Sequence, residues 1–171
     1  MTSSLQHLIL MGVSGSGKTT IAELLTERLG WAFAEADDFH PSANIEKMSA
    51  GIPLTDEDRW PWLRTIAEWL STKTAAGQNT VVTCSALRRV YRDLLREGEG
   101  QVRFVHLTGT MDTIESRLDD RSGHFMPAAL LGSQFDTLEP LDSDEDGVVV
   151  SIDAPPEKIA DEVMARLGIT A

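Results

Sequence analysis

Cysteine, basic side chains and long apolar runs are all scarce in this chain of 171 residues. The one cysteine, Cys84, cannot form an internal disulfide, which is typical of a protein from a reducing compartment. Only 15 basic side chains accompany 27 acidic ones, and a chain with a formal net charge of -12 meets nucleic acid repulsively. No apolar run approaches the roughly 20 residues that span a bilayer, and the N-terminus lacks the charged region of a signal peptide. We therefore expect a cytoplasmic protein whose partners are neither nucleic acid nor a membrane.

The overall composition, with 42% hydrophobic and 25% charged residues, is that of an ordinary globular domain. Short apolar runs alternate with longer helical patterns, which favours βαβ units and a parallel sheet. Strands are expected at residues 7–11, 31–34, 81–84, 102–107 and 148–152. Helices are expected at residues 18–29, 43–48, 59–75, 87–97, 111–121, 128–137 and 156–167. Ser42 is the expected N-cap of the second helix. No linker rich in Pro and Ser divides the chain, so we predict one domain over residues 1–171.

The strongest motif is the sequence GVSGSGKT at residues 12–19, which matches the phosphate-binding pattern G-x-x-x-x-G-K-[ST] in full. An apolar strand pattern precedes the motif and a helical pattern follows it. Glycines allow backbone N–H groups to point at phosphate oxygens, and the N-terminus of the next helix adds its positive dipole. Lys18 is expected to reach the β- and γ-phosphates, and the Thr19 hydroxyl to bind Mg²⁺. The motif therefore predicts a site for a nucleoside triphosphate.

This motif does not specify a reaction, because kinases, GTPases and ATP-driven machines share it. No N-K-x-D string for guanine recognition occurs in the sequence. The D-x-x-G match at residues 144–147 lies in an acidic stretch, and we interpret it as a solvated turn. The chain is also short for a motor ATPase. A small-molecule kinase is favoured, and it needs a base for the acceptor hydroxyl and a lid that excludes water.

The ends of the predicted strands supply candidates for the kinase chemistry. Asp37 follows the second predicted strand, at the edge where open α/β sheets bind ligands, and is placed to accept a hydroxyl proton. Arg88 follows the third predicted strand and lies near the same edge. Arg117 and Arg121, one helical turn apart and followed by Gly123, fit a lid that closes over phosphates.

Other polar and aromatic side chains are interpreted as structural. Arg92 and Arg96 are expected on a solvated helix face. His7 and His106 lie in strand patterns, where a structural role is favoured over a ligand role. The tryptophans of the third predicted helix fit packing against the sheet better than stacking on a ligand; they are Trp60, Trp62 and Trp69.

Longer strings outside the phosphate-binding motif resemble the small bacterial gluconokinases, which are similar in fold to shikimate and adenylate kinases. The strings are MGVSGSGKT at 11–19, DDFHP at 37–41, NIEKM at 44–48, GIPLTDEDR at 51–59, CSALRR at 84–89 and YRDLLR at 91–96. Further matches lie within residues 115–125 and 134–139. The resemblance thus runs from the first strand to the C-terminal helix, and the middle strings are far more specific than the phosphate-binding motif.

The resemblance implies a P-loop kinase core: a three-layer αβα sandwich with five parallel strands in the order 2-3-1-4-5 and a helical lid at about residues 117–137. It implies transfer of the γ-phosphoryl group of ATP, with Mg²⁺, to the terminal hydroxyl of D-gluconate. Many relatives are dimers, so a homodimer is expected. The implied catalytic residues are Lys18, Asp37 and Arg121. The implied ATP contacts are Gly12, Ser14, Gly15, Ser16, Gly17, Lys18, Thr19, Thr20, Arg117, Arg121 and Pro155. The implied substrate contacts are Asp37, His40, Arg59, Ser85, Arg88, His124 and Gln134.

Three positions depart from the family pattern. Glu35 stands where many relatives have Asp, so a contact with Mg²⁺ through water requires the longer side chain to adjust. Arg88 stands where Lys is expected, which keeps the charge and changes the geometry. Met126 and Pro127 follow Phe125 in the predicted lid.

Two questions stay open at the level of sequence. The resemblance does not decide whether Arg59 or Arg88 holds the substrate carboxylate. A kinase of another hydroxy acid such as shikimate, and a nucleotide-binding regulator without turnover, are the alternatives to a gluconokinase.

Overall fold

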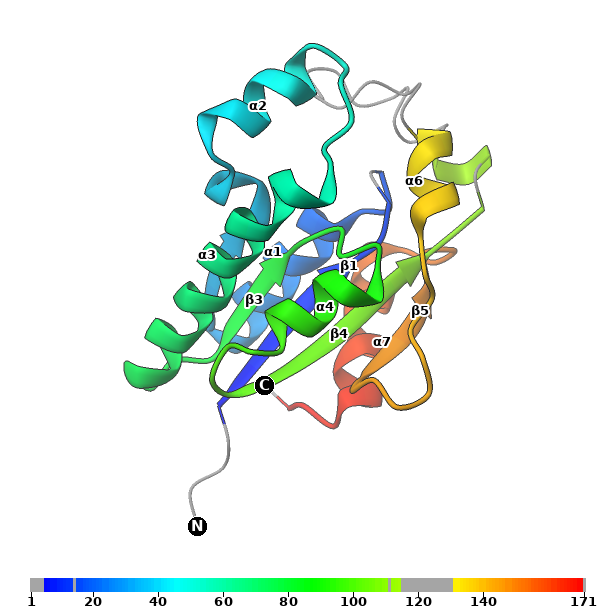
Figure 1. Cartoon of the computed structure of the whole chain (residues 1–171). Coiled ribbons are helices and arrows are strands. Elements are labelled where there is room, and N and C mark those ends of the chain that lie inside the picture. The colour runs from blue at the N-terminus through cyan, green and yellow to red at the C-terminus, as the bar shows by residue number, and fades with distance from the viewer. Residues whose placement is uncertain (1–4, 14, 111, 115–130, 171) are drawn as a thin grey trace.

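Five parallel strands form the centre of the molecule in the computed structural model, which describes residues 5–13, 15–110, 112–114 and 131–170 (Figure 1). The strands are β1 (Gln6–Met11), β2 (Ala32–Glu35), β3 (Thr80–Thr83), β4 (Gln101–Thr108) and β5 (Gly147–Ser151). They lie in the order β2-β3-β1-β4-β5, which confirms the predicted order. β1 is central: its Ile9 is level with Val82 of β3 and with Phe104 of β4.

The helices follow the strands, as the alternating pattern predicts. They are α1 (Lys18–Leu29), the 3₁₀ helix η1 (Ala36–Phe39), α2 (Ser42–Ser49), α3 (Asp56–Ala75), α4 (Arg89–Leu95), α6 (Leu131–Thr137) and α7 (Pro156–Leu167). The predicted helix at 111–121 and the start of the one at 128–137 lie largely outside the described residues.

Three helix starts differ from the sequence prediction, and one of them is that of α4, which begins at Arg89 rather than at residue 87. Ser42 is not the cap of α2, because the Pro41 carbonyl accepts the first helical hydrogen bonds, from Asn44 N and Ile45 N, and Ser42 is already helical. The third helix begins at Asp56 rather than at residue 59. A capping box causes this early start: Thr55 Oγ1 accepts from Asp58 N at 3.2 Å, while Thr55 N donates to Asp58 Oδ2 at 2.9 Å.

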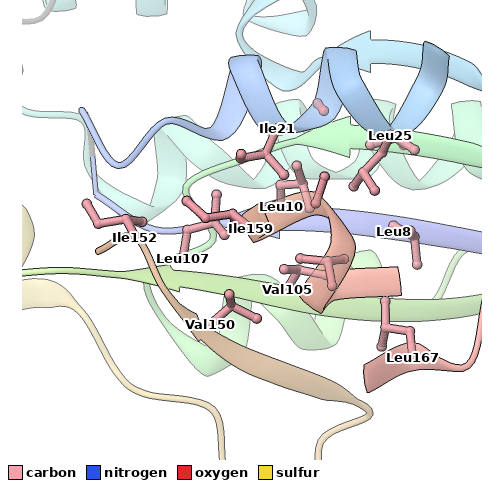
Figure 2. Close-up of a cluster of buried hydrophobic side chains, with 14 of the residues drawn as sticks. Leu8, Leu10, Ile21, Leu25, Val105, Leu107, Val150, Ile152, Ile159 and Leu167 are labelled. Atoms are coloured by element: carbon pink, nitrogen blue, oxygen red, sulfur yellow. The ribbon is translucent and has the colours of Figure 1, made fainter. Parts of the chain in front are cut away.

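Both faces of the sheet are covered, so successive strand residues alternate between two cores. Leu8 and Leu10 point toward α1 and α7, and Figure 2 shows them among the buried aliphatic side chains of that face. Ile9 and Met11 point to the opposite face, where they pack in one cluster with residues of α3 and α4. This two-sided burial fixes the sheet between the helix layers and gives its strand ends fixed positions.

The carboxyl ends of the strands meet at one edge of the sheet, where ligands bind in folds of this kind. β1 leads into the phosphate-binding motif, β2 into η1, and β3 into residues 84–88. The candidate residues of the site lie on these connections. Among the described residues, no helix is both long and apolar enough to cross a membrane.

Candidate active site

The described motif residues 12, 13 and 15–17 lie in the connection between β1 and α1, and Lys18 and Thr19 begin α1. The three glycines of the motif, Gly12, Gly15 and Gly17, have φ angles of 144°, 86° and 90°, which side chains rarely allow. A Cβ on Gly12 would lie 2.7 Å from the Leu107 carbonyl oxygen, so this position also requires glycine for space. Because the loop ends where α1 begins, the backbone N–H groups of the helix start face the region that the loop encloses.

Two polar side chains of the loop suit an anionic ligand. Lys18 Nζ donates to the carbonyl oxygens of Gly12 and Val13, each at 3.0 Å, so the ammonium group lies against the loop. Ser16 Oγ is buried and finds no hydrogen-bond partner among the residues that the structure describes. The loop therefore combines a positive charge with an unsatisfied hydroxyl group, as a phosphate site requires.

The residues present fit a magnesium ion. Thr19 Oγ1 donates to Glu35 Oε1 at 2.9 Å, which brings a hydroxyl and a carboxylate together beside the loop. Mg²⁺ takes oxygen ligands and usually combines one or two protein groups with water and substrate phosphates. Within the described ranges there is no cluster of three or more His, Cys, Asp or Glu side chains that could hold a metal alone, so this small oxygen pair suits Mg²⁺ better than a metal bound only by protein groups.

A cleft beside η1 brings together five of the seven predicted substrate contacts. It holds about 620 Å³ of space, partly open to solvent, and its polar lining residues are Asp37, His40, Arg59, Ser85 and Gln134. Its apolar lining residues are Met48, Ile52, Pro53, Leu54, Trp62 and Leu87. Arg88 instead lines a neighbouring hollow, which shares Arg59 with the cleft.

His40 is held firmly at the inner wall of the cleft. Its ring stacks on Trp62 with centroids 4.1 Å apart and an interplanar angle of 15°, and its side chain is 3% exposed. Burial, assisted by the positive charge of Arg59, lowers the pKa of His40 to about 4. The ring is therefore neutral at physiological pH. Its Nε2 atom lies 3.8 Å from Asp37 Oδ1.

The two arginines near the cleft differ in their partners. Arg59 Nη1 donates to the Leu54 carbonyl at 2.9 Å and to Tyr91 Oη at 3.1 Å, and it lies 3.8 Å from Asp56 Oδ1. Arg88 Nη1 lies 2.7 Å from Asp56 Oδ2, and Arg88 Nε lies 3.4 Å from a carboxylate oxygen of Glu139. The positive charge of Arg88 is thus shared with two carboxylates at the mouth of the site.

Asp56 and Tyr91 belong to this arrangement, although sequence reasoning did not single them out. The Tyr91 hydroxyl donates to Asp56 Oδ1 at 2.5 Å, and this hydrogen bond, followed by the charge of Arg88, lowers the pKa of Asp56. Tyr91 is the single tyrosine of the chain. Both residues lie inside the strings that carry the family resemblance, and this position was the one sequence feature that could have marked them as site residues.

Arg92 contradicts its prediction, because it is fully buried rather than solvated. Its Nε donates to Glu145 Oε1 at 2.8 Å and its Nη2 to Glu145 Oε2 at 3.1 Å. Arg96 Nη1 also lies 2.9 Å from Glu145 Oε1, so Arg96 is only partly solvated. The interpretation of residues 144–147 as a solvated turn is wrong for Glu145, whose side chain is inaccessible. The reason is that α4 packs on the sheet, and Arg92 points between α4 and the connection to β5.

The remaining interpretations have mixed outcomes. His7 and His106 are buried in strands, and His7 Nδ1 lies 2.7 Å from Thr80 Oγ1, which confirms structural positions. Trp62 is buried in the core, as predicted. Thr20 in α1 and Pro155, the N-cap of α7, are exposed. Four predicted contacts lie outside the described residues, namely Ser14, Arg117, Arg121 and His124.

Comparison with known proteins places the chain in a family. A family model described as an AAA domain matches residues 8–141. A gluconokinase of Gluconobacter oxydans (strain 621H) is 49% identical over 159 residues, which cover 93% of this chain and 89% of that protein.

Two solved structures extend the agreement to three dimensions. An unliganded sugar kinase from Janibacter sp. HTCC2649 is 53% identical with a TM-score of 0.93, covering 96% of this chain and 95% of that one. A gluconokinase from Sinorhizobium meliloti 1021 is 45% identical with a TM-score of 0.86, covering 95% of this chain and 91% of that one. With the phosphate-binding loop and the adjoining cleft in place, these likenesses show that the chain belongs to the gluconokinase family of P-loop kinases.

Proposed function

We propose that this protein transfers the γ-phosphoryl group of ATP to the terminal hydroxyl of D-gluconate, forming 6-phosphogluconate and ADP. The observation that carries the proposal is the cleft lined by Asp37, His40 and Arg59 at the sheet edge that also holds the phosphate-binding loop. A carboxylate base and a guanidinium in one small cleft suit a substrate with a hydroxyl at one end and a carboxylate at the other. Family membership supports the same substrate.

The reaction needs little covalent work from the protein, since positioning and charge stabilisation dominate phosphoryl transfer. The acceptor oxygen forms a bond to the γ-phosphorus while the bond from that phosphorus to the β,γ-bridging oxygen breaks. Asp37 takes the hydroxyl proton. Lys18 stabilises the charge that develops on the phosphates. Thr19 and Glu35 would hold Mg²⁺, whose chemistry is to neutralise phosphate charge and orient the phosphates.

Arg59 is better suited than Arg88 to hold the substrate carboxylate. Arg59 lines the cleft with Asp37, whereas Arg88 lines the hollow beside it. The hydrogen bonds of Arg59 Nη1 go to a carbonyl and a phenol oxygen, while Arg88 Nη1 already binds Asp56 at 2.7 Å. A new carboxylate therefore gains more from Arg59, and Arg88 acts from a second position at the mouth.

The substrate assignment is tested by ADP release from the purified protein with ATP and Mg²⁺ against gluconate, shikimate, related sugar acids, glucose and AMP. Stimulation by gluconate is expected. Preferential stimulation by shikimate would keep the kinase mechanism and change the substrate. ATP binding without stimulation by any acceptor would support a nucleotide-binding regulator instead.

The role of Asp37 is tested by Asp37→Asn, with Asp38→Asn as the matched control. Both carboxylates lie on η1 and both are exposed, but only Asp37 lines the cleft. Loss of a general base lowers kcat by about 10²- to 10⁴-fold. We expect this loss for the Asp37 variant and near-normal turnover for the Asp38 variant. Equal turnover of the two variants would remove Asp37 from the mechanism.

Three further properties stay predictions of the family resemblance: dependence on Mg²⁺, a homodimer and a cytoplasmic location. Metal dependence is measured by titrating Mg²⁺ into the chelated enzyme, and the Thr19→Val variant should require more of the ion. The oligomeric state is measured by light scattering on the eluting protein.

A further inference from the structure

Asn44 on α2 does not line the cleft itself but contacts His40, which does. A backbone carbonyl fixes the orientation of the Asn44 amide. Asn44 Nδ2 donates to the Asp58 carbonyl oxygen, in the first turn of α3, at 2.9 Å. A carbonyl oxygen is only an acceptor, so the amide group facing it must be the NH₂. The opposite orientation would place two acceptors against each other in a buried position, where Asn44 is 3% exposed.

The same NH₂ group also faces His40. Asn44 Nδ2 lies 3.2 Å from His40 Nδ1, and both side chains are buried. An amide NH₂ has two protons, one for the carbonyl and one for the imidazole. His40 Nδ1 must therefore accept, which means that it carries a lone pair. In a neutral imidazole the proton then resides on the other nitrogen, Nε2.

From these contacts we propose that Asn44 is a positioning residue that holds His40 as the Nε2–H tautomer, so that the imidazole presents a proton donor to the substrate cleft. Two hydrogen bonds impose this tautomer: the Asn44 amide donates to the Asp58 carbonyl, and it also donates to His40 Nδ1. The other ring nitrogen of His40, Nε2, faces Asp37 Oδ1 at 3.8 Å.

This separation suits a shared substrate hydroxyl, an argument that rests on the proposed kinase function. At 3.8 Å the imidazole and the carboxylate are too far apart for a direct hydrogen bond. A hydroxyl oxygen beside them can lie about 2.8 Å from both. It accepts from Nε2–H with one lone pair and donates its proton to Asp37. The second lone pair is then aimed by these two bonds and is available to attack phosphorus.

Neighbouring groups hold this arrangement in place. Trp62 stacks on the ring and fixes its plane, and Trp62 Nε1 is itself anchored to the Ala36 carbonyl at 2.6 Å. Lys47 Nζ, one turn along α2 from Asn44, donates to Asp58 Oδ2 at 2.8 Å and ties α2 to α3. Among the described residues, the charged groups facing the ring are Asp37 on η1 and Arg59 on α3, while α2 contributes the neutral amide.

The direct test is NMR of the ring nitrogens of His40 in the protein without substrates. Protonated and unprotonated imidazole nitrogens have well-separated ¹⁵N resonances, and His40→Gln identifies the signals. At pH 7 we expect an unprotonated Nδ1 and a protonated Nε2 in the wild type. A protonated Nδ1 would overturn the proposal whatever the substrate is, so this result is independent of the proposed function.

The functional test uses Asn44→Asp, which keeps the shape and replaces the donor with an acceptor. Its carboxylate favours a proton on Nδ1 and raises the pKa of His40. As the pH rises through that raised pKa, the ring loses the Nε2 proton, and the donor to the cleft disappears. We therefore expect kcat/KM for gluconate to fall at alkaline pH by about tenfold or more in this variant, with the KM for ATP unchanged. The wild type keeps its Nε2 proton and its activity over the same range.

Asn79→Asp is the matched control, because this substitution makes the same chemical change at the opposite edge of the sheet. There Asn79 Oδ1 accepts from Gln6 N at 2.7 Å, and Asp preserves that acceptor. This control should keep the wild-type pH profile. Asn44→Ala serves if the Asp variant fails to fold, and it should shift the ring toward a mixture of tautomers. An alkaline profile for Asn44→Asp that matches the wild type, or an unchanged tautomer in Asn44→Ala, would overturn the proposal.

Discussion

The buried pair Arg92–Glu145 makes a strong prediction about stability. Glu145→Gln keeps the shape of the side chain and removes its charge, which leaves the guanidinium of Arg92 without its counter-charge in a fully buried position. Breaking one side of a buried ion pair costs about 3–5 kcal/mol. Since a domain is stable by roughly 5–15 kcal/mol in total, the variant should lose at least about a fifth of its stability.

The same connection contains a control that differs mainly in burial. Arg89 binds Asp144 through two hydrogen bonds, at 2.8 and 2.9 Å, and this pair is exposed. Exposed pairs contribute little, because water and salt screen them. Asp144→Asn should therefore leave stability almost unchanged, although its ion pair is as short as the buried one.

Urea unfolding at pH 7 gives the free energy of unfolding of both variants. Similar m-values would indicate that only the stability has changed. The double variant Arg92→Met/Glu145→Leu removes both charges and should cost less than the sum of the two single variants. A loss below about 1 kcal/mol for Glu145→Gln would refute the reasoning, because it would mean that the Arg92 charge is solvated or paired elsewhere.

Three further predictions follow from the described contacts. Burial lowers the pKa values of His40 and His106 to about 4, from 6.5 in the unfolded chain, so stability should be full above pH 6.5 and fall as the pH drops toward 4. Urea unfolding at pH 7 and pH 5 should differ by about 1–2 kcal/mol per histidine, and equal stability at the two values would contradict these shifts. Gly12→Ala introduces a Cβ 2.7 Å from a backbone carbonyl and should abolish ATP binding in a nucleotide titration, whereas Gly30→Ala, also at positive φ but in open space, should still bind. Burial raises the pKa of Cys84 to about 12, so iodoacetamide at pH 8 should label this thiol in urea but hardly in the folded protein; rapid labelling of the folded state would show that the strand end opens.

Local sequence patterns predicted the fold well, because strands, helices and the phosphate-binding loop have short-range signatures. The predicted ends of all five strands lie within one residue of the observed ends, and α1 and α7 match fully. The error at the start of α3 has a local cause. A capping box formed by Thr55 and Asp58 extends the helix, and an Asp in place of the usual Glu or Gln weakened that signal in the sequence.

Non-local partners were beyond the reach of such patterns. Arg92 and Glu145 are 53 positions apart, and helical spacing cannot tell a solvated arginine from one that meets a distant carboxylate. The tautomer of His40 also depends on a non-local contact, because it is determined by where α3 places the Asp58 carbonyl relative to α2. The family resemblance predicts a substrate contact at His40, but only the folded arrangement indicates which nitrogen carries its proton.

Those distant contacts determine the shape of the cleft wall after β3. Ala86 has a positive φ of 44°, a strained conformation for a residue other than glycine, and Arg92 Nη1 holds its carbonyl at 2.9 Å. The next residue, Leu87, is held in the same way, because its carbonyl accepts a hydrogen bond from Glu139 N at 2.6 Å. Ser85 and Leu87 therefore line the cleft because the Arg92 side chain of α4 and the backbone N–H of Glu139 hold the carbonyls of Ala86 and Leu87 in place. Most residues that line the cleft with polar groups could be predicted from local strings, whereas the residues that hold them in place are recognised only once the chain is folded.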